Sequence, residues 1–299
     1  MAKAVVPPPD GGYPNFTTAE GQKALFSLTT GSANTAVGWY SLFGNAAGSF
    51  NTATGAGSLL FNTADANTAF GAAALLFNTT GINNTAVGAA TLLNNSIAEE
   101  NTATGAFAMY SNTEGDFNTA NGAFALYFNT IGERNTAIGD SALYQNTNGN
   151  RNTAVGNTAL VTNTEGDDNT ATGVGALRFN TLGQQNTATG AQALSSNTTG
   201  IVNTATGNRA LESNMDGTSN TATGVEALQD TASGGGNTPM VIKRSYTTTP
   251  ATTTRPLAFL PWVASLLDSA TQAWAVQRAP ASLRPITLFV SAITSVVRT

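Results

Sequence analysis

Residues 135–151, NTAIGDSALYQNTNGNR, are one copy of a 17-residue unit that fills most of this 299-residue chain. Its pattern, numbered here as positions 1 to 17, is N-T-A-x-G-x-x-A-L-x-x-N-T-x-G-x-x. Every copy has 17 residues except one of 16, and copies begin at residues 17, 34, 51, 67, 84, 101, 118, 135, 152, 169, 186, 203, 220 and 237. A fixed period this short predicts that each unit is one coil of a solenoid.

The positions that hardly vary indicate how a coil is built. Position 3 is Ala in all thirteen coils, position 5 is Gly in all thirteen, and position 9 is Leu in twelve, with Met109 as the exception. Because side chains alternate faces along a strand, N-T-A-x-G places the Ala inside a narrow coil and the Thr and the fourth residue outside. The Leu then fills the interior from the opposite wall, where burial stabilises the fold by about 1.5–3 kcal/mol per side chain.

Gly and Asn mark the corners of the coil. Gly at positions 5 and 15 predicts turns that need a positive φ, a region that Asn also tolerates. Asn at position 12 recurs from Asn45 to Asn214, and Asn residues aligned on successive coils are expected to hydrogen-bond as ladders. A stable helix of about 12 residues does not fit between these residues. The sequence therefore predicts an all-β parallel β-solenoid of thirteen coils, roughly 60 Å long at a strand spacing of about 4.8 Å.

The repeat divides the chain into three parts. Residues 1–16 are expected to form an N-terminal extension and cap, with residues 13–16 and the irregular coil at Thr17 covering the first sheet edge. Residues 17–238 form the solenoid. Residues 239–299 are a non-repeat tail that we expect to be largely disordered, and its plain interpretation is a cap, a linker or a partner-binding tail.

A sharper hypothesis for the tail concerns the gene. In the reading frame that joins the third base of each codon to the first two bases of the next, codon degeneracy allows the repeat to be encoded. In that frame the repeat can continue, in register, from Pro239 onward. We therefore hypothesise that residues 239–299 are a frame-shifted readout of further coils, and that any anchor or chaperone domain beyond them is lost. Codons that cannot encode N-N-T-G-D-N-N-T-A in that frame would refute this idea.

Charge narrows the choice of partners. Only 10% of residues are charged, against a usual figure of about 25%. Up to Asp230 the chain has 16 acidic and 6 basic residues, and from Met240 onward it has 1 acidic and 6 basic. An acidic repeat cannot neutralise phosphates, so no nucleic-acid partner is expected. No apolar run is long enough for a membrane-spanning segment, and residues 1–9 lack the apolar core of a signal peptide.

Missing residue types argue against catalysis. The chain has no Cys and no His, which removes thiolate metal sites, the commonest general base and the commonest metal ligand. Acidic pairs, namely Glu99 with Glu100, Asp167 with Asp168 and Glu114 with Asp116, could supply oxygen ligands for Ca²⁺. They do not recur at one coil position, so we interpret them as solvated turn charges. We expect no enzyme activity, no cofactor and no bound metal.

Several coils carry a recognisable motif. Residues 84–88, 135–139 and 152–156 read N-T-A-V-G, N-T-A-I-G and N-T-A-V-G. They resemble the S-V-A-I-G motif in the YadA-like head repeats of trimeric autotransporter adhesins. The array is also similar to the stalks of bacterial and phage surface fibres that end in an intramolecular chaperone. The resemblance covers about three quarters of the chain, and it implies a left-handed β-roll and a homotrimer with the Thr and fourth residue facing the threefold axis.

The fourth position departs from that motif. It is apolar at Val37, Phe70, Val87, Ile138 and Val155, and it is Thr in all four coils from Thr172 to Thr223. A candidate binding face therefore consists of Thr170, Thr172, Thr187, Thr189, Thr204, Thr206, Thr221 and Thr223. One interpretation is an ice-binding or glycan-binding face on a monomer, and the other is that Thr is a good strand former on a solvated face.

These observations favour a non-enzymatic structural or adhesive protein. We expect an extracellular or bacterial cell-surface location, a homotrimeric assembly, and a host-surface, matrix or glycan ligand held by a repetitive Thr/Asn-rich face. A phage-type fibre stalk is the remaining alternative. Because a fold does not fix a function, the resemblance names no receptor.

Overall fold

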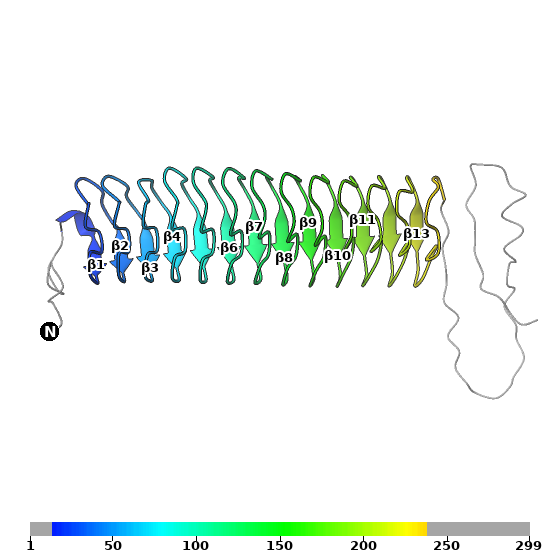
Figure 1. Cartoon of the computed structure of the whole chain (residues 1–299), viewed down its shortest axis with the longest axis horizontal. Coiled ribbons are helices and arrows are strands. Elements are labelled where there is room, and N and C mark those ends of the chain that lie inside the picture. The colour runs from blue at the N-terminus through cyan, green and yellow to red at the C-terminus, as the bar shows by residue number, and fades with distance from the viewer. Residues whose placement is uncertain (1–13, 238–299) are drawn as a thin grey trace, which may run out of the picture.

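The computed structural model describes residues 14–237, which form an elongated solenoid with one strand per coil (Figure 1). All thirteen strands belong to one parallel sheet in sequence order. A short 3-10 turn, η1, precedes them at Pro14–Phe16. The strands are β1 Thr18–Glu20, β2 Thr35–Val37, β3 Thr52–Thr54, β4 Thr68–Phe70, β5 Thr85–Val87, β6 Thr102–Thr104, β7 Thr119–Asn121, β8 Thr136–Ile138, β9 Thr153–Val155, β10 Thr170–Thr172, β11 Thr187–Thr189, β12 Thr204–Thr206 and β13 Thr221–Thr223. The predicted all-β parallel solenoid is confirmed.

We number the coils 1 to 13, from the coil that begins at Thr17 to the one that begins at Asn220. Each has three walls: the strand wall (positions 1–5), the second wall (positions 6–12) and the third wall (positions 13–17). Each strand is the T-A-x segment, and its middle Ala is buried in every coil. The register joins each Ala to the Ala of the next coil, including the 16-residue step from Ala53 to Ala69.

The apolar core is a narrow column that runs along the rod. Ala at position 3 packs in one cluster with residues at positions 8 and 9, which come from the second wall. In coil 8 these residues are Ala137, Ala142 and Leu143, and none of them has exposed surface. The predicted placement of Ala and Leu on opposite walls is therefore confirmed.

Two ladders of buried Asn side chains run beside this column. Asn146, at position 12, donates from Nδ2 to Asn129 Oδ1 of the previous coil at 2.7 Å and to the Gly149 carbonyl at 2.9 Å. Asn135, at position 1 of the same coil, also donates to that carbonyl, at 2.8 Å. Its Oδ1 accepts the backbone N–H of Asn152 at 3.0 Å. The predicted position-12 ladder is confirmed, and position 1 adds a second ladder.

The 16-residue coil interrupts the position-12 ladder. Asn62 donates to the Ala64 carbonyl, and its Oδ1 accepts from Asn67 and Asn78. Asn45 Oδ1, one coil earlier, is buried without a hydrogen-bond partner. A single missing residue is thus absorbed at the cost of one unsatisfied acceptor.

The two recurrent glycines have different roles. Gly139, at position 5, has a φ of 130°, which only Gly adopts readily. Gly149, at position 15, does not have a positive φ. A Cβ there would lie 2.5 Å from Asn146 Oδ1 and 2.6 Å from the Gly166 carbonyl oxygen. The predicted positive φ is correct for position 5 and wrong for position 15, where Gly leaves room for the Asn ladder to approach the backbone. Ala98 occupies this position in coil 5 and its carbonyl accepts the same two Asn bonds, so the coil adjusts there.

Each coil adopts the left-handed region at three places, positions 7, 9 and 17, and in most coils none of the three residues is Gly. In coil 8 these are Ser141, Leu143 and Arg151, with φ of 55°, 52° and 55°. Such a conformation costs about 1–3 kcal/mol per residue and persists only when the surroundings enforce it. Here the enforcing contacts are backbone hydrogen bonds to the neighbouring coils, such as Leu143 N–H to the Ala159 carbonyl at 3.0 Å.

The N-terminal end continues the coil pattern. Asn15 accepts the Ala33 N–H at 2.8 Å, as position 16 does elsewhere, and Phe16 has the positive φ of position 17. Phe16 is 94% exposed, so it does not cover the core. The rest of the expected cap and the predicted tail at 239–299 lie outside the described residues. Within residues 14–237, no helix has the length and apolar character needed to cross a membrane.

Candidate binding surfaces of the solenoid

The eight threonines of the candidate face lie together on the strand wall of coils 10–13. Each coil contributes two, at positions 2 and 4, and both are exposed while the Ala between them is buried. Strand pairing aligns Thr170 with Thr187 and Thr172 with Thr189, and the same register continues to β13. The result is a regular two-by-four array of hydroxyl and methyl groups on a parallel sheet.

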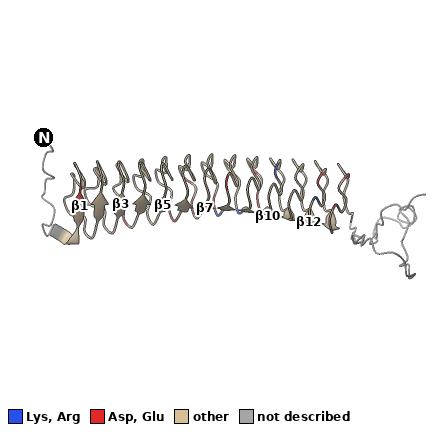
Figure 2. Ribbon diagram, turned by 90° about the horizontal axis from the view of Figure 1, so that it is seen from below, with Lys and Arg blue, Asp and Glu red and all other residues tan. Residues whose placement is uncertain are grey.

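The strand wall is less uniform in the earlier coils. Val37, Phe70, Val87 and Ile138 occupy position 4 and are 38–46% exposed. Thr104 and Asn121 lie between them and are also exposed. Charge is nearly absent from this wall, because Glu20 is the one charged residue within any of the thirteen described strands (Figure 2).

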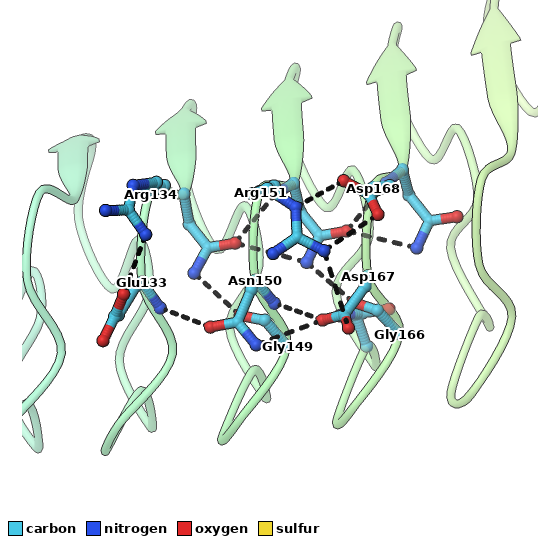
Figure 3. Close-up of polar contacts among 12 residues, drawn as sticks. Glu133, Arg134, Gly149, Asn150, Arg151, Gly166, Asp167 and Asp168 are labelled. Atoms are coloured by element: carbon cyan, nitrogen blue, oxygen red, sulfur yellow. Dashed lines mark hydrogen bonds and ion pairs between the residues drawn. The ribbon is translucent and has the colours of Figure 1, made fainter.

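The third wall carries a polar ladder that was not predicted from the sequence. Figure 3 shows Glu133 N–H donating to Asn150 Oδ1 at 2.8 Å and Asn150 N–H donating to Asp167 Oδ1 at 2.7 Å. Asp116 accepts the Glu99 N–H in the same way. Position 16 therefore satisfies the backbone of the preceding coil, and the short polar side chains that recur there were the available signal.

An ion pair joins coils 8 and 9 on this wall. Arg151 Nε donates to Asp168 Oδ1 at 2.7 Å, and Nη2 donates to Oδ2 at 2.9 Å (Figure 3). This bidentate hydrogen bonding from Arg151 holds the pKa of Asp168 below its ordinary value and raises the pKa of Arg151. The pair is exposed, so screening keeps its contribution to stability small.

Three of the six acidic residues in the predicted pairs have structural partners. Asp116 and Asp167 accept backbone N–H groups, and Asp168 pairs with Arg151. Among residues 14–237 there is no group of three or more His, Cys, Asp or Glu side chains that could hold a metal ion. These three carboxylates act in coil-to-coil contacts rather than as simple solvated charges.

The second wall carries stacked aromatic and aliphatic side chains in coils 1–9. Position 10 is apolar in nine consecutive coils, at Phe26, Phe43, Leu60, Leu76, Leu93, Tyr110, Tyr127, Tyr144 and Val161. Tyr127 stacks on Tyr110 and Tyr144 with centroids 5.1 and 5.3 Å apart. Phe107 and Phe124 stack beside them at position 7, with centroids 5.5 Å apart.

Ring contacts between positions join the second wall of coils 6–8 into one surface. Phe124 at position 7 touches Tyr127 at position 10, and Tyr127 touches Phe128 at position 11. Burial raises the pKa of Tyr127, and Tyr110 and Tyr144 add to the rise. This surface was not predicted, although the unbroken apolar run at position 10 is visible in the sequence.

The same wall is polar in coils 10–13. Position 10 there holds Arg178, Ser195, Glu212 and Gln229. Arg209 Nε, from position 7, lies 3.7 Å from Glu212 Oε2. Gln229 Nε2 donates to Glu212 Oε2 at 2.6 Å. The boundary between an apolar and a polar second wall therefore falls between coils 9 and 10, where the Thr array of the strand wall begins.

The rod therefore offers three chemically distinct surfaces: the Thr array of the strand wall, the hydrogen-bonded polar ladder of the third wall and the apolar second wall of coils 1–9. Comparisons of the chain with protein-family models, with curated proteins and with solved structures return no match. The case for a function consequently rests on these surfaces.

Proposed function

We propose that this chain is a non-enzymatic structural or adhesive rod of an extracellular or bacterial cell surface. The observation that carries the proposal is the in-register repetition of one outward-facing Thr per coil on a stiff, extensively hydrogen-bonded scaffold. An array of identical weak contacts at fixed spacing gains affinity through multivalency rather than through one pocket. A host-surface, matrix or glycan polymer with its own repeat is the ligand class that suits such a wall.

The absence of His and Cys from the sequence supports a role without catalysis. A general base or a nucleophile would have to come from carboxylates, hydroxyls or amines. The carboxylates of Asp116 and Asp167 are engaged in holding neighbouring coils together. We assign the recurrent Asn residues to the scaffold rather than to a reactive surface, because their side chains lie inside the coil.

A homotrimer joined through the strand walls is the assembly that the resemblance to YadA-like heads implies. Apolar side chains at Val37, Phe70, Val87 and Ile138 would then face one another along the axis. In this assembly the contact would be confined to the coils with apolar residues at position 4, so the Thr array of coils 10–13 would stay open to a ligand. Light scattering after size exclusion tests this assembly, since a trimer has about three times the 30.4 kDa mass of one chain.

Adhesion is tested with beads that carry the full chain. We expect the beads to stay attached, under flow, to glass coated with extracellular-matrix gel or with immobilised glycans. Replacing Thr189 and Thr206 by Lys should reduce attachment at least tenfold, because both residues are exposed and central in the array. The matched control replaces Thr104 of coil 6 by Lys. Equal attachment of all three proteins would refute adhesion through the Thr array.

Ice binding by a monomer is the second candidate, and the flat two-by-four Thr array favours it. Exposed Thr residues in register present hydroxyl and methyl groups at a regular spacing, about 4.8 Å between coils. Thermal hysteresis in a cold-stage assay, lost in Thr189→Lys, would support ice binding over adhesion. The placement on a cell surface rather than in a phage-type fibre is tested by the neighbouring genes.

A further inference from the structure

The second wall of coils 1–9 exposes several large apolar side chains to solvent. Trp39 is 56% exposed, Phe61 46% and Phe77 45%. Nine rungs at about 4.8 Å make the wall roughly 43 Å long, and positions 6–11 span at most about 20 Å. The resulting footprint, at most roughly 850 Å², is comparable to the approximately 800 Å² that each partner buries in a stable complex. A largely apolar face of that size indicates an interaction surface.

Charge limits this surface to coils 1–9. Positions 6, 7, 10 and 11 of coils 2–7 hold no charged residue. The same positions of coils 10–13 hold five, at Arg178, Arg209, Glu212, Glu226 and Asp230. A partner that covered the whole rod would bury these charges at a high cost. The partner therefore contacts coils 1–9 through an apolar face of about the same length.

The relief of the wall indicates how that partner is oriented. Coils 3–5 have small residues at positions 6 and 7, with Ala56, Gly57, Ala72, Ala73, Ala89 and Ala90. Coils 6 and 7 have bulky rings at the same wall, where Phe107, Tyr110, Phe124 and Tyr127 stack. At positions 6 and 7 the wall thus consists of a low saddle next to a ridge, and its natural complement there is a ridge next to a saddle. Position 11 differs, because Phe61 and Phe77 project from coils 3 and 4.

We propose that the occupant is a second copy of this chain, packed antiparallel on the second wall about a twofold axis at coil 5. Coil n of one copy then faces coil 10 − n of the other, so the ridge of coils 6 and 7 fills the partner's saddle at coils 4 and 3. All nine apolar rungs meet apolar rungs, and coils 10–13 project freely at both ends. A parallel pair would instead press the rings of coils 6 and 7 against each other.

The charges at positions 6, 7, 10 and 11 agree with this orientation. In coils 1–9 they number two, Lys23 in coil 1 and Asp140 in coil 8. The antiparallel pair places coil 1 over coil 9, within one rung of Asp140, about 4.8 Å along the rod. In a parallel pair these residues would lie seven coils apart. The proposal goes beyond the proposed function, because it leaves the strand wall and its Thr array free.

A charged substitution on the axis tests the pairing. Ala89, at position 6 of coil 5, is exposed, so Ala89→Arg should leave the fold intact while placing two like charges at the centre of the pair. We expect light scattering to report half the wild-type mass, one copy in place of two. If strand walls also join, each trimer exposes three second walls, and Ala89→Arg should leave a trimer in place of a larger open assembly. Ala191→Arg, the same change at the same position of coil 11, should leave the mass unchanged.

Three outcomes of this measurement would overturn the proposal. They are a monomeric wild-type chain, an unchanged mass in Ala89→Arg, and an equal loss of mass in Ala191→Arg. A strand-wall trimer alone would show a factor of three and no response to Ala89→Arg, so failure of the pairing and failure of the proposed trimer are distinguishable. Far-ultraviolet circular dichroism checks that each variant is folded.

Cysteine cross-linking tests the orientation, because the chain has no Cys of its own. Gln22 in coil 1 and Asn157 in coil 9 both occupy position 6 and are exposed. We expect a mixture of Gln22→Cys and Asn157→Cys chains to form the mixed disulfide under mild oxidation, with each chain alone remaining uncross-linked. Absence of the mixed disulfide, in chains that light scattering shows to be paired, would overturn the antiparallel arrangement.

Discussion

Coils 1–9 and coils 10–13 share one interior and differ on their outer walls. In both regions position 3 is a buried Ala, and position 12 is a buried Asn from coil 2 to coil 12. On the outside, position 10 changes from nine apolar residues to Arg178, Ser195, Glu212 and Gln229. The comparison teaches that the interior positions specify the coil, while the outer positions are free to specify what each region contacts.

If the two regions share one interior, breaking the Asn ladder should lower the free energy of unfolding by the same amount in both. Asn146→Ala removes the donor to Asn129 Oδ1 and one donor to the Gly149 carbonyl. Asn180→Ala removes the equivalent bonds to Asn163 and Gly183. An unsatisfied buried group and the lost bonds together predict about 3 kcal/mol of destabilisation for either variant. Denaturant unfolding measures it.

The last rung of the ladder is the control for this prediction. Asn214 Oδ1 is buried without a partner, so Asn214→Ala also removes an unsatisfied acceptor. We expect it to cost about 1 kcal/mol less than Asn180→Ala. A large difference between Asn146→Ala and Asn180→Ala would show that the two regions have separate interiors.

Substitutions at position 10 of the second wall should lower the stability of the chain in coils 1–9 and not in coils 10–13. Tyr127 stacks on two rings, and each aromatic pair contributes about 0.5–1.5 kcal/mol beyond burial, so Tyr127→Ala should destabilise the chain by about 2 kcal/mol. Ser195→Ala, at the same position of coil 11, should stay within about 0.5 kcal/mol of the parent. Both are measured in the Ala89→Arg background, so that pairing between copies does not contribute. Equal effects would remove the distinction between the walls.

The fold was largely predictable because its determinants repeat at fixed spacing. The Ala present in every coil and the Leu present in twelve coils indicate which side chains lie inside a coil. The Asn that recurs at position 12 predicts the ladder. The reason for Gly149 was not predictable, because it depends on Asn146 of the same coil and Gly166 of the next. The second wall was missed since Tyr127 and its neighbours vary in identity while keeping apolar character. The Thr array was located correctly, whereas its ligand depends on a partner that the sequence does not contain.

Backbone strain offers a smaller test at the edge of the apolar region. Thr158, in coil 9, is β-branched and has a φ of 54°, a conformation that disfavours such residues. Asn tolerates this region, so Thr158→Asn should stabilise the chain by about 0.5–1 kcal/mol. Thr158→Val keeps the branched Cβ and should bring no gain. Thermal unfolding distinguishes the two, and a gain in Thr158→Val would contradict the strain argument.

The smallest effect concerns the ion pair that ties together the last two coils of the apolar region. Because Arg151 lowers the pKa of Asp168 in the folded chain, the pair adds stability above the unfolded pKa of that carboxyl, and the contribution is lost as the pH falls through the folded pKa. Arg151→Gln should therefore flatten the loss of stability below about pH 4, the ordinary pKa of an Asp carboxyl. In the Asp168→Asn background the same substitution should have a much smaller effect, through the longer 4.0 Å contact of Arg151 with Asp167. Denaturant midpoints between acid and neutral pH, at low salt, measure both. If Arg151→Gln shifts the acid slope equally in the parent chain and in the Asp168→Asn background, the stability comes from the net charge of the rod rather than from this contact.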